Sequence, residues 1–111
     1  MTERIRLSQR RASITFSFCH EWETGRGFNY KCTVGYFENG TVGEIFLNAQ
    51  KHDTALDANA REAAIFCSIA LQYGATLEIL RGTVQRDNKG YPASPIGMAL
   101  DEIVKHGFER R

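Results

Sequence analysis

The sequence has no long hydrophobic run, no internal repeat and no low-complexity segment. No stretch approaches the roughly 18 apolar residues that a membrane-spanning helix needs, so we expect no membrane partner. The N-terminal stretch TERIRLSQRRAS is charged and lacks the apolar core that is typical of a secretory signal. These absences indicate a cytoplasmic protein of one domain, since 111 residues is near the commonest domain size.

An excess of charge of either sign is also missing. The chain has 14 basic and 13 acidic residues, which gives a formal net charge of +1. Proteins that bind duplex nucleic acid in bulk carry a large positive excess, so we expect no duplex partner. Arginines gather at the start of the chain. We therefore expect a single domain over residues 1–111, with residues 1–11 as a flexible basic N-terminal segment.

Cysteine is scarce, and the motifs of common enzymes are absent. Cys19, Cys32 and Cys67 form no CxxC pair, and no pair of histidines stands at metal-ligand spacing. We expect no metal site and three small buried thiols. The sequence also lacks a Gly-x-Ser-x-Gly elbow, an HExxH motif and a Walker loop, so we expect no enzyme activity and no cofactor. His52 beside Asp53 is a conceivable general base, but a polar histidine in a surface loop is the simpler interpretation.

The feature that organises the chain is residues 43–73, where an apolar strand leads through a polar loop into a long alanine-rich helix. Thr54 and Asp57 form a capping arrangement at the start of this helix. Apolar residues then recur at helical spacing, and Gly74 follows as a left-handed end residue. The pattern predicts a largely buried helix, which its many alanines allow to approach a sheet or a second helix closely.

The residues before this stretch alternate between apolar and polar side chains, which is typical of half-buried strands. Asn39-Gly40 is the signal for a tight hairpin. The predicted strands cover residues 12–22, 28–37 and 42–47.

The residues after the long helix predict two further helices. Thr76 begins a short one over 75–82, and Ser94 with Pro95 at the first helical position begins another. Strands followed by helices predict an α+β fold. We expect a three-stranded antiparallel meander, then a long helix and two shorter helices packed on one face.

Three motifs together resemble the TSCPD domain, which is found at the C-terminal end of adenosylcobalamin-dependent ribonucleotide reductases and in short free-standing proteins. They are EIFLN at 44–48, LQYGATLEIL at 71–80 and SPIGMAL at 94–100, in the order and spacing of that family. The motif that names the family has a cysteine between Ser and Pro, and an aspartate after the Pro. This chain has Ser94-Pro95-Ile96, so the resemblance implies no thiol role. The chain is also too short for the catalytic barrel of a reductase.

The chain is similar in size and plan to a second group, the small phage anti-defence proteins that sequester cyclic nucleotides. The type-one Thoeris inhibitor is an example. This resemblance rests on architecture rather than on a motif, and it implies binding of a nucleotide signal without hydrolysis.

Anion binding is the chemistry that the loops favour most. Residues 48–53 and 86–93 each lead toward a predicted helix start, where free backbone N–H groups and the helix dipole attract phosphate. Cations, amides and a tyrosine ring in these loops suit a nucleotide's phosphate, base edges and base plane. Ordinary solvent-exposed loops are the alternative interpretation, because every capped helix has this geometry.

Two residues outside the loops have two interpretations each. Arg61 either pairs with Asp57 one turn earlier or lines an anion pocket shared between subunits. Trp22, the only tryptophan, is either half-buried core or a platform for base stacking. The predicted nucleotide-binding residues are Trp22, Asn48, Lys51, Arg61, Arg86, Asn88, Lys89, Tyr91 and Ser94.

The sequence therefore predicts a non-catalytic protein that binds and sequesters a cyclic or phosphorylated nucleotide. An open sheet edge and a very apolar helix favour a homo-oligomer with sites between protomers. The alternative is a protein-interaction or regulatory domain that acts with a ribonucleotide reductase.

Overall fold

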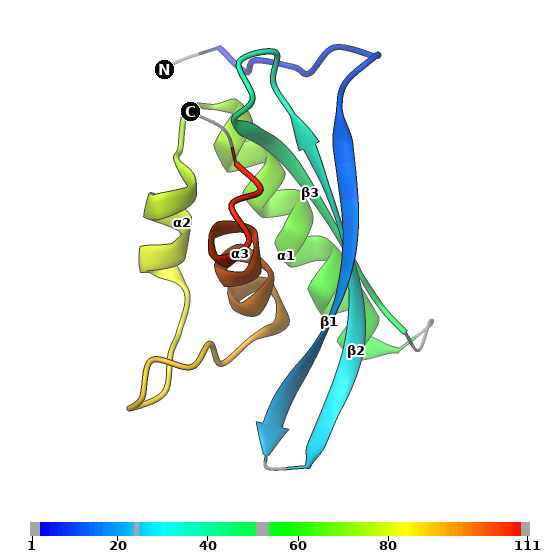
Figure 1. Ribbon diagram of the computed structural model, residues 1–111, viewed down its shortest axis with the longest axis vertical. Helices are drawn as coiled ribbons and strands as arrows, with labels where there is room; N and C mark the ends of the chain where they lie inside the picture. The colour runs from blue at the N-terminus through cyan, green and yellow to red at the C-terminus, as the bar shows by residue number, and fades with distance from the viewer. Residues whose placement is uncertain (1–2, 24, 51–53, 110–111) are drawn as a thin grey trace.

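The computed structural model describes residues 3–23, 25–50 and 54–109, without the side chains of Trp22 and Glu23. The strands form one antiparallel sheet in the order β1-β2-β3, and three helices follow (Figure 1). This order confirms the predicted α+β fold. The elements are β1 (Ser13–Glu23), β2 (Arg26–Tyr36), β3 (Val42–Ala49), α1 (Ala55–Gln72), α2 (Leu77–Thr83) and α3 (Pro95–Lys105).

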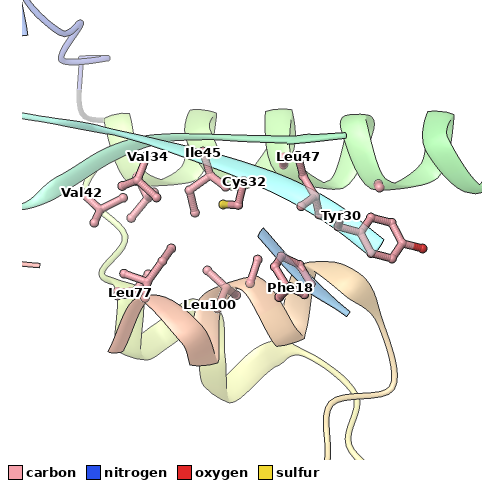
Figure 2. Packing of buried hydrophobic residues seen from close by; sticks show 14 of the residues in the cluster. Phe18, Tyr30, Cys32, Val34, Val42, Ile45, Leu47, Leu77 and Leu100 are labelled. Atoms are coloured by element: carbon pink, nitrogen blue, oxygen red, sulfur yellow. The ribbon is translucent and has the colours of Figure 1, made fainter. Parts of the chain in front are cut away.

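The hydrophobic core lies between the sheet and the helices. Alternate residues of each strand turn toward the helices and are buried or partly buried, as the alternation of the sequence predicts. Figure 2 shows strand side chains such as Val34 and Ile45 pointing toward α2 and α3, which contribute Leu77 and Leu100. The opposite face of the sheet, which we call the open face, carries Thr15, Ser17, Cys19 and Lys31, all exposed or partly so.

Helix α1 lies along the outer edge of β3, where its side chains replace a fourth strand. The Ser68 hydroxyl accepts a hydrogen bond from Ile45 N–H at 2.8 Å and lies 3.0 Å from the Ile45 carbonyl oxygen. Gln72 Nε2 donates to the Gly43 carbonyl at 3.0 Å, and the Asp57 carboxylate accepts from Ala49 N–H at 2.8 Å. The buried alanines between these polar residues permit the close approach that the sequence predicts. This edge of the sheet is therefore covered.

The helix ends follow the predicted signals. The side-chain oxygens of Thr54, Thr76 and Ser94 each accept a hydrogen bond from the backbone N–H three residues later. Gly74 follows α1 at φ 107°, a left-handed conformation that favours glycine.

The segment before β1 forms no helix or strand over residues 3–12, but it contacts the rest of the fold. Arg4 Nε donates to Gln72 Oε1 at 2.7 Å, Ile5 N–H donates to the Gln72 carbonyl at 2.7 Å, and Arg11 pairs with Glu44. Because Gln72 also bonds to β3, this segment adds to the cover over one end of the β3 edge.

One expectation about the cysteines is wrong. Cys32 is buried and Cys67 is partly buried, but Cys19 is exposed. Cys19 alternates with Phe18 and His20 along β1, and these neighbours turn toward the helices. Its thiol is therefore on the open face. Burial raises the pKa of the Cys32 thiol to about 12.

Candidate functional site

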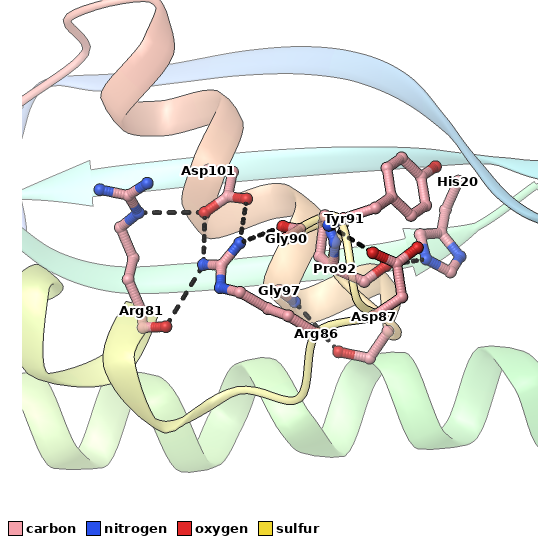
Figure 3. Close-up of polar contacts among 10 residues, drawn as sticks. His20, Arg81, Arg86, Asp87, Gly90, Tyr91, Pro92, Gly97 and Asp101 are labelled. Atoms are coloured by element: carbon pink, nitrogen blue, oxygen red, sulfur yellow. Dashed lines mark hydrogen bonds and ion pairs between the residues drawn. The ribbon is translucent and has the colours of Figure 1, made fainter.

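The loop between α2 and α3 is held by an ion-pair cluster. Arg86 makes two hydrogen bonds to the Asp101 carboxylate on α3, at 2.7 and 2.8 Å, and Arg81 Nε donates to the same carboxylate at 3.0 Å (Figure 3). Arg86 also donates to the carbonyl groups of Gly90 and Arg81. The predicted phosphate ligand Arg86 is thus already bound to a carboxylate, and it ties the loop to α3.

Other residues of this loop, among them Tyr91 and Ser94, also make contacts that hold the loop in place. The Tyr91 ring stacks on His20 of β1, with ring centroids 5.7 Å apart, and its hydroxyl accepts from Glu21 N–H at 3.0 Å. His20 Nε2–H donates to the Pro92 carbonyl at 2.9 Å. The Ser94 hydroxyl is the N-cap of α3. These contacts join the loop to β1 and leave Tyr91 and Ser94 less available to a ligand.

The tip of the loop carries the exposed residues Asn88 and Lys89. The hollow beneath it, about 640 Å³, is lined by Lys89 and Lys105 but also by Asp87, Asp101 and Glu102. Three carboxylates at this surface disfavour a phosphate. Residues of the two predicted loops line separate hollows, since one hollow contains Asn48 and Gln50 and the other contains Lys89 and Tyr91.

The Arg86–Asp101 contact predicts how stability depends on pH. The hydrogen bond from Arg86, then that from Arg81, lowers the pKa of the Asp101 carboxyl below its usual value. A lowered folded-state pKa stabilises the fold above the unfolded-state pKa of about 3.9, and this contribution is lost as pH falls through the folded-state value. We expect Asp101→Asn to lower the Tm at pH 7 and to flatten its fall below about pH 4. Circular dichroism melts over a pH series measure both effects, and parallel curves for the two proteins would contradict this role.

A second hollow lies on the open face of the sheet, at the end nearest the start of α1. It has a volume of about 700 Å³ and contains Ser17, Phe18, Cys19, Asn29, Tyr30, Lys31, Asn48, Ala49 and Gln50, and we call it the sheet hollow. The strand register arranges its polar side chains in two rows across the sheet, Ser17–Lys31–Asn48 and Cys19–Asn29–Gln50. The described lining holds one cation, three amides and no carboxylate.

The amides of the sheet hollow are partly preorganised. Asn29 Nδ2 donates to Gln50 Oε1 at 3.1 Å, and Gln50 N–H donates to the Asn29 carbonyl at 2.9 Å. Asn48 is partly exposed beside Lys31 in the other row. This arrangement offers donors and acceptors for a polar planar group and a positive charge for an anion.

Phe46 lies on the open face in the next row, beside Thr33, and is 46% exposed. Neither Phe46 nor Lys31 is among the candidate residues predicted from the sequence. The signal was present, because alternation along β3 opposes Phe46 to the buried Ile45 and Leu47, and Lys31 lies between the buried Tyr30 and Cys32. An exposed aromatic ring beside a lysine and an amide, here Lys31 and Asn48, is typical of a stacking surface.

Of the remaining predicted residues, the structure describes the side chain of Arg61 but not those of Lys51 and Trp22. Arg61 is 59% exposed and its Nη1 lies 3.6 Å from Asp57 Oδ2, so the ion-pair interpretation applies. The other Asp57 oxygen accepts a hydrogen bond from Ala49 N–H, and Arg61 is not among the residues that line the sheet hollow. Lys51, with His52 and Asp53, lies outside the described residues, as does the side chain of Trp22.

Two absences apply to the described residues alone. Within residues 3–23, 25–50 and 54–109, no group of three or more His, Cys, Asp or Glu side chains is placed to hold a metal ion. Over the same described ranges, no helix has both the length and the apolar character to cross a membrane.

Comparison with known proteins gives one informative similarity. Over 76 residues the chain is 36% identical to the vitamin B12-dependent ribonucleotide reductase of Agrobacterium fabrum (strain C58). The alignment covers 68% of this chain but only 6% of the reductase. No protein-family profile and no solved structure matches the chain. The chain is therefore similar to one small region of a much larger enzyme, as the resemblance to the TSCPD domain leads one to expect.

Proposed function

We propose that this chain is a TSCPD-type domain that binds a cyclic or phosphorylated nucleotide without altering it, and that the sheet hollow is its binding site. The observation that carries the proposal is the pair of polar rows on the open face, which hold Lys31 and three amides with no carboxylate among the described lining residues. The similarity to a ribonucleotide reductase supports the choice of a nucleotide as ligand.

The geometry suggests a role for each group. Lys31 stands in the middle strand of the sheet, with Ser17 and Asn48 on either side, where its ammonium group reaches a phosphate. Asn29, Asn48 and Gln50 supply donors and acceptors for the edge of a base. Phe46 offers an exposed ring for base stacking, in the role that the sequence analysis gave to Trp22 or Tyr91.

A pair of matched variants tests the site. We expect Lys31→Ala to weaken nucleotide binding about tenfold or more, because a charge-assisted hydrogen bond to phosphate is lost. We expect Arg86→Ala to lower the Tm but to leave affinity unchanged, since this guanidinium is engaged by Asp101. Isothermal titration calorimetry against a panel of mononucleotides and cyclic dinucleotides measures the affinities.

The control for this experiment is a lysine that lies outside the proposed site. Lys89→Ala removes another exposed lysine, outside the sheet hollow, and is expected to bind like the wild type. Affinity that falls with Lys89→Ala and not with Lys31→Ala would move the site to the α2–α3 loop. Mass spectrometry of the ligand after incubation tests the absence of catalysis, because a converted nucleotide would contradict a binding protein.

The narrower proposal, that the chain is a phage anti-defence protein that sequesters a cyclic nucleotide signal, rests on the architectural resemblance alone. Its test is protection of the signal. A stoichiometric excess of the chain would withhold the nucleotide from its receptor and release it intact on denaturation. A cytoplasmic location likewise stays a prediction.

A second candidate function is docking on a ribonucleotide reductase, and the outer surface of α1 favours it. Ile65, Phe66, Ile69 and Tyr73 are 49%, 68%, 36% and 43% exposed and recur at helical spacing on one side of the helix. Such an apolar stripe is typical of a protein-interaction surface. We expect Phe66→Glu to abolish co-purification with a vitamin B12-dependent reductase from the same organism. Val104→Glu, at a 42% exposed apolar residue of α3, is the matched control outside the stripe.

A further inference from the structure

Helix α1 covers the β3 edge of the sheet, whereas the described residues leave much of the β1 edge uncovered. Side chains of α1 bond to the backbone of β3 at Gly43, Ile45 and Ala49. On β1, Glu21 N–H donates to the Tyr91 hydroxyl and Ala12 accepts from Tyr36 of β2. Bonding to β2 alternates along an antiparallel strand, so the odd-numbered residues from 13 to 19 direct their backbone groups away from β2. Within the described chain these four residues have no backbone partner on that side.

The exposed edge of β1 also lacks the features that usually prevent an edge strand from pairing with another chain. Residues 12–19, ASITFSFC, contain no charge and no proline, and the register has no irregularity until Glu21. Solitary edge strands are usually protected by a lysine, a proline or a bulge. An uncharged edge with alternating apolar and hydroxyl side chains is suited to pairing with another strand.

The charges that flank this segment favour a second copy of the chain as the partner and an antiparallel direction of pairing. Arg10 and Arg11 precede the uncharged segment, Arg11 being paired with Glu44, and Glu21 follows it. In an antiparallel pair of two copies, the basic end of one strand lies opposite the acidic end of the other. A parallel pair would place like charges together, which is unfavourable.

We propose that β1 pairs antiparallel with β1 of a second copy of this chain, about a two-fold axis beside Phe16. The available backbone runs from Ser13 to Cys19 and is symmetric about Phe16, so Ser13 faces Cys19 of the second copy and Thr15 faces its Ser17. These four facing pairs exchange two hydrogen bonds each, about eight in all. The result is a continuous sheet of two meanders.

The pairing also extends the sheet hollow, a step that rests on the proposed function. Ser17 and Cys19 are the β1 members of its two rows. In the pair, the hydroxyls of Thr15 and Ser13 from the second copy continue these rows beyond β1. The nucleotide site is therefore bounded by both copies, and the two sites adjoin across the axis.

A matched pair of lysine substitutions tests the interface. Thr15 and Thr33 share a row on the open face and bond to each other at 2.9 Å, but Thr15 is on the edge strand and Thr33 is on the central strand. We expect native mass spectrometry and sedimentation of the wild type to give twice the 12.5 kDa chain mass. Thr15→Lys is expected to give the monomer, and Thr33→Lys the dimer. A monomeric wild type at hundreds of micromolar, or equal behaviour of the two variants, would overturn the proposal.

Crosslinking tests the register. Ser13→Cys places a thiol opposite the native Cys19 of the second copy, so a short bismaleimide is expected to give a covalent dimer that disappears with the additional change Cys19→Ser. Ser8→Cys, before the strand, is the control. A wild-type dimer without this crosslink would overturn the β1 pairing. The measured mass tests the proposed dimer, whereas calorimetry with Lys31→Ala tests nucleotide binding. Failure of the interface and failure of the proposed function are therefore separate results.

Discussion

Asp57→Ala is expected to lower the free energy of unfolding by about 2 to 4 kcal/mol. The Asp57 side chain is 2% exposed and accepts a hydrogen bond from Ala49 N–H at 2.8 Å. Alanine leaves this buried donor at the end of β3 without a partner, which costs about 1 to 3 kcal/mol. It also removes a negative charge from the first turn of α1, where the helix dipole favours an acid.

Urea denaturation followed by circular dichroism measures this loss, and two further variants separate its causes. Asp57→Asn keeps an oxygen that accepts from Ala49 and is expected to cost less than alanine. Arg61→Ala removes only the exposed partner at 3.6 Å and is expected to cost under about 1 kcal/mol. If Arg61→Ala were as damaging as Asp57→Ala, the ion pair rather than the strand contact would be the important interaction.

Leu100→Ala is expected to cost about 2 to 5 kcal/mol, which is a large part of the stability of a domain of this size. Leu100 has no exposed surface and lies in the core that α3 shares with the sheet and α2 (Figure 2). Truncation removes buried apolar area and leaves a cavity among Phe18, Leu77 and the strand side chains, which tightly packed neighbours fill only in part.

The same unfolding measurement tests this prediction. Val104→Ala, on the same helix but 42% exposed, is expected to change stability by less than about 1 kcal/mol. Leu100→Met keeps most of the volume and is expected to cost less than about 1.5 kcal/mol. Similar losses for Leu100→Ala and Val104→Ala would mean that α3 does not close the core as the structure describes.

The strands and helices were predictable because their signals are local. Alternation marks the strands, and the caps at Thr54, Thr76 and Ser94 depend on backbone groups only three residues away. Nothing beyond the neighbouring sequence is needed to recognise such features, so the element order follows from the chain alone.

The position of α1 and the environment of Arg86 were not predictable in this way. Periodicity shows which side of α1 is buried, but it does not distinguish the face of a sheet from its edge. The partner of Arg86 is Asp101, which is 15 residues away and on a different element. Isolated in a polar loop, Arg86 is indistinguishable from a phosphate ligand. The sheet hollow combines residues from three strands, and only the register shows that Ser17, Lys31 and Asn48 share a row.

Because α1 covers the outer edge of β3, the sheet can be extended by strand addition from one edge only. A sheet can keep growing by adding chains edge to edge only if every chain has two available edges. This chain offers one, since Ser68, Gln72 and Asp57 occupy the hydrogen-bonding positions of the other. In the proposed pairing, strand addition through β1 therefore stops at two copies, and a fibre is not expected to form by this route. Only displacement of α1 from β3 would open the second edge that a polymer needs.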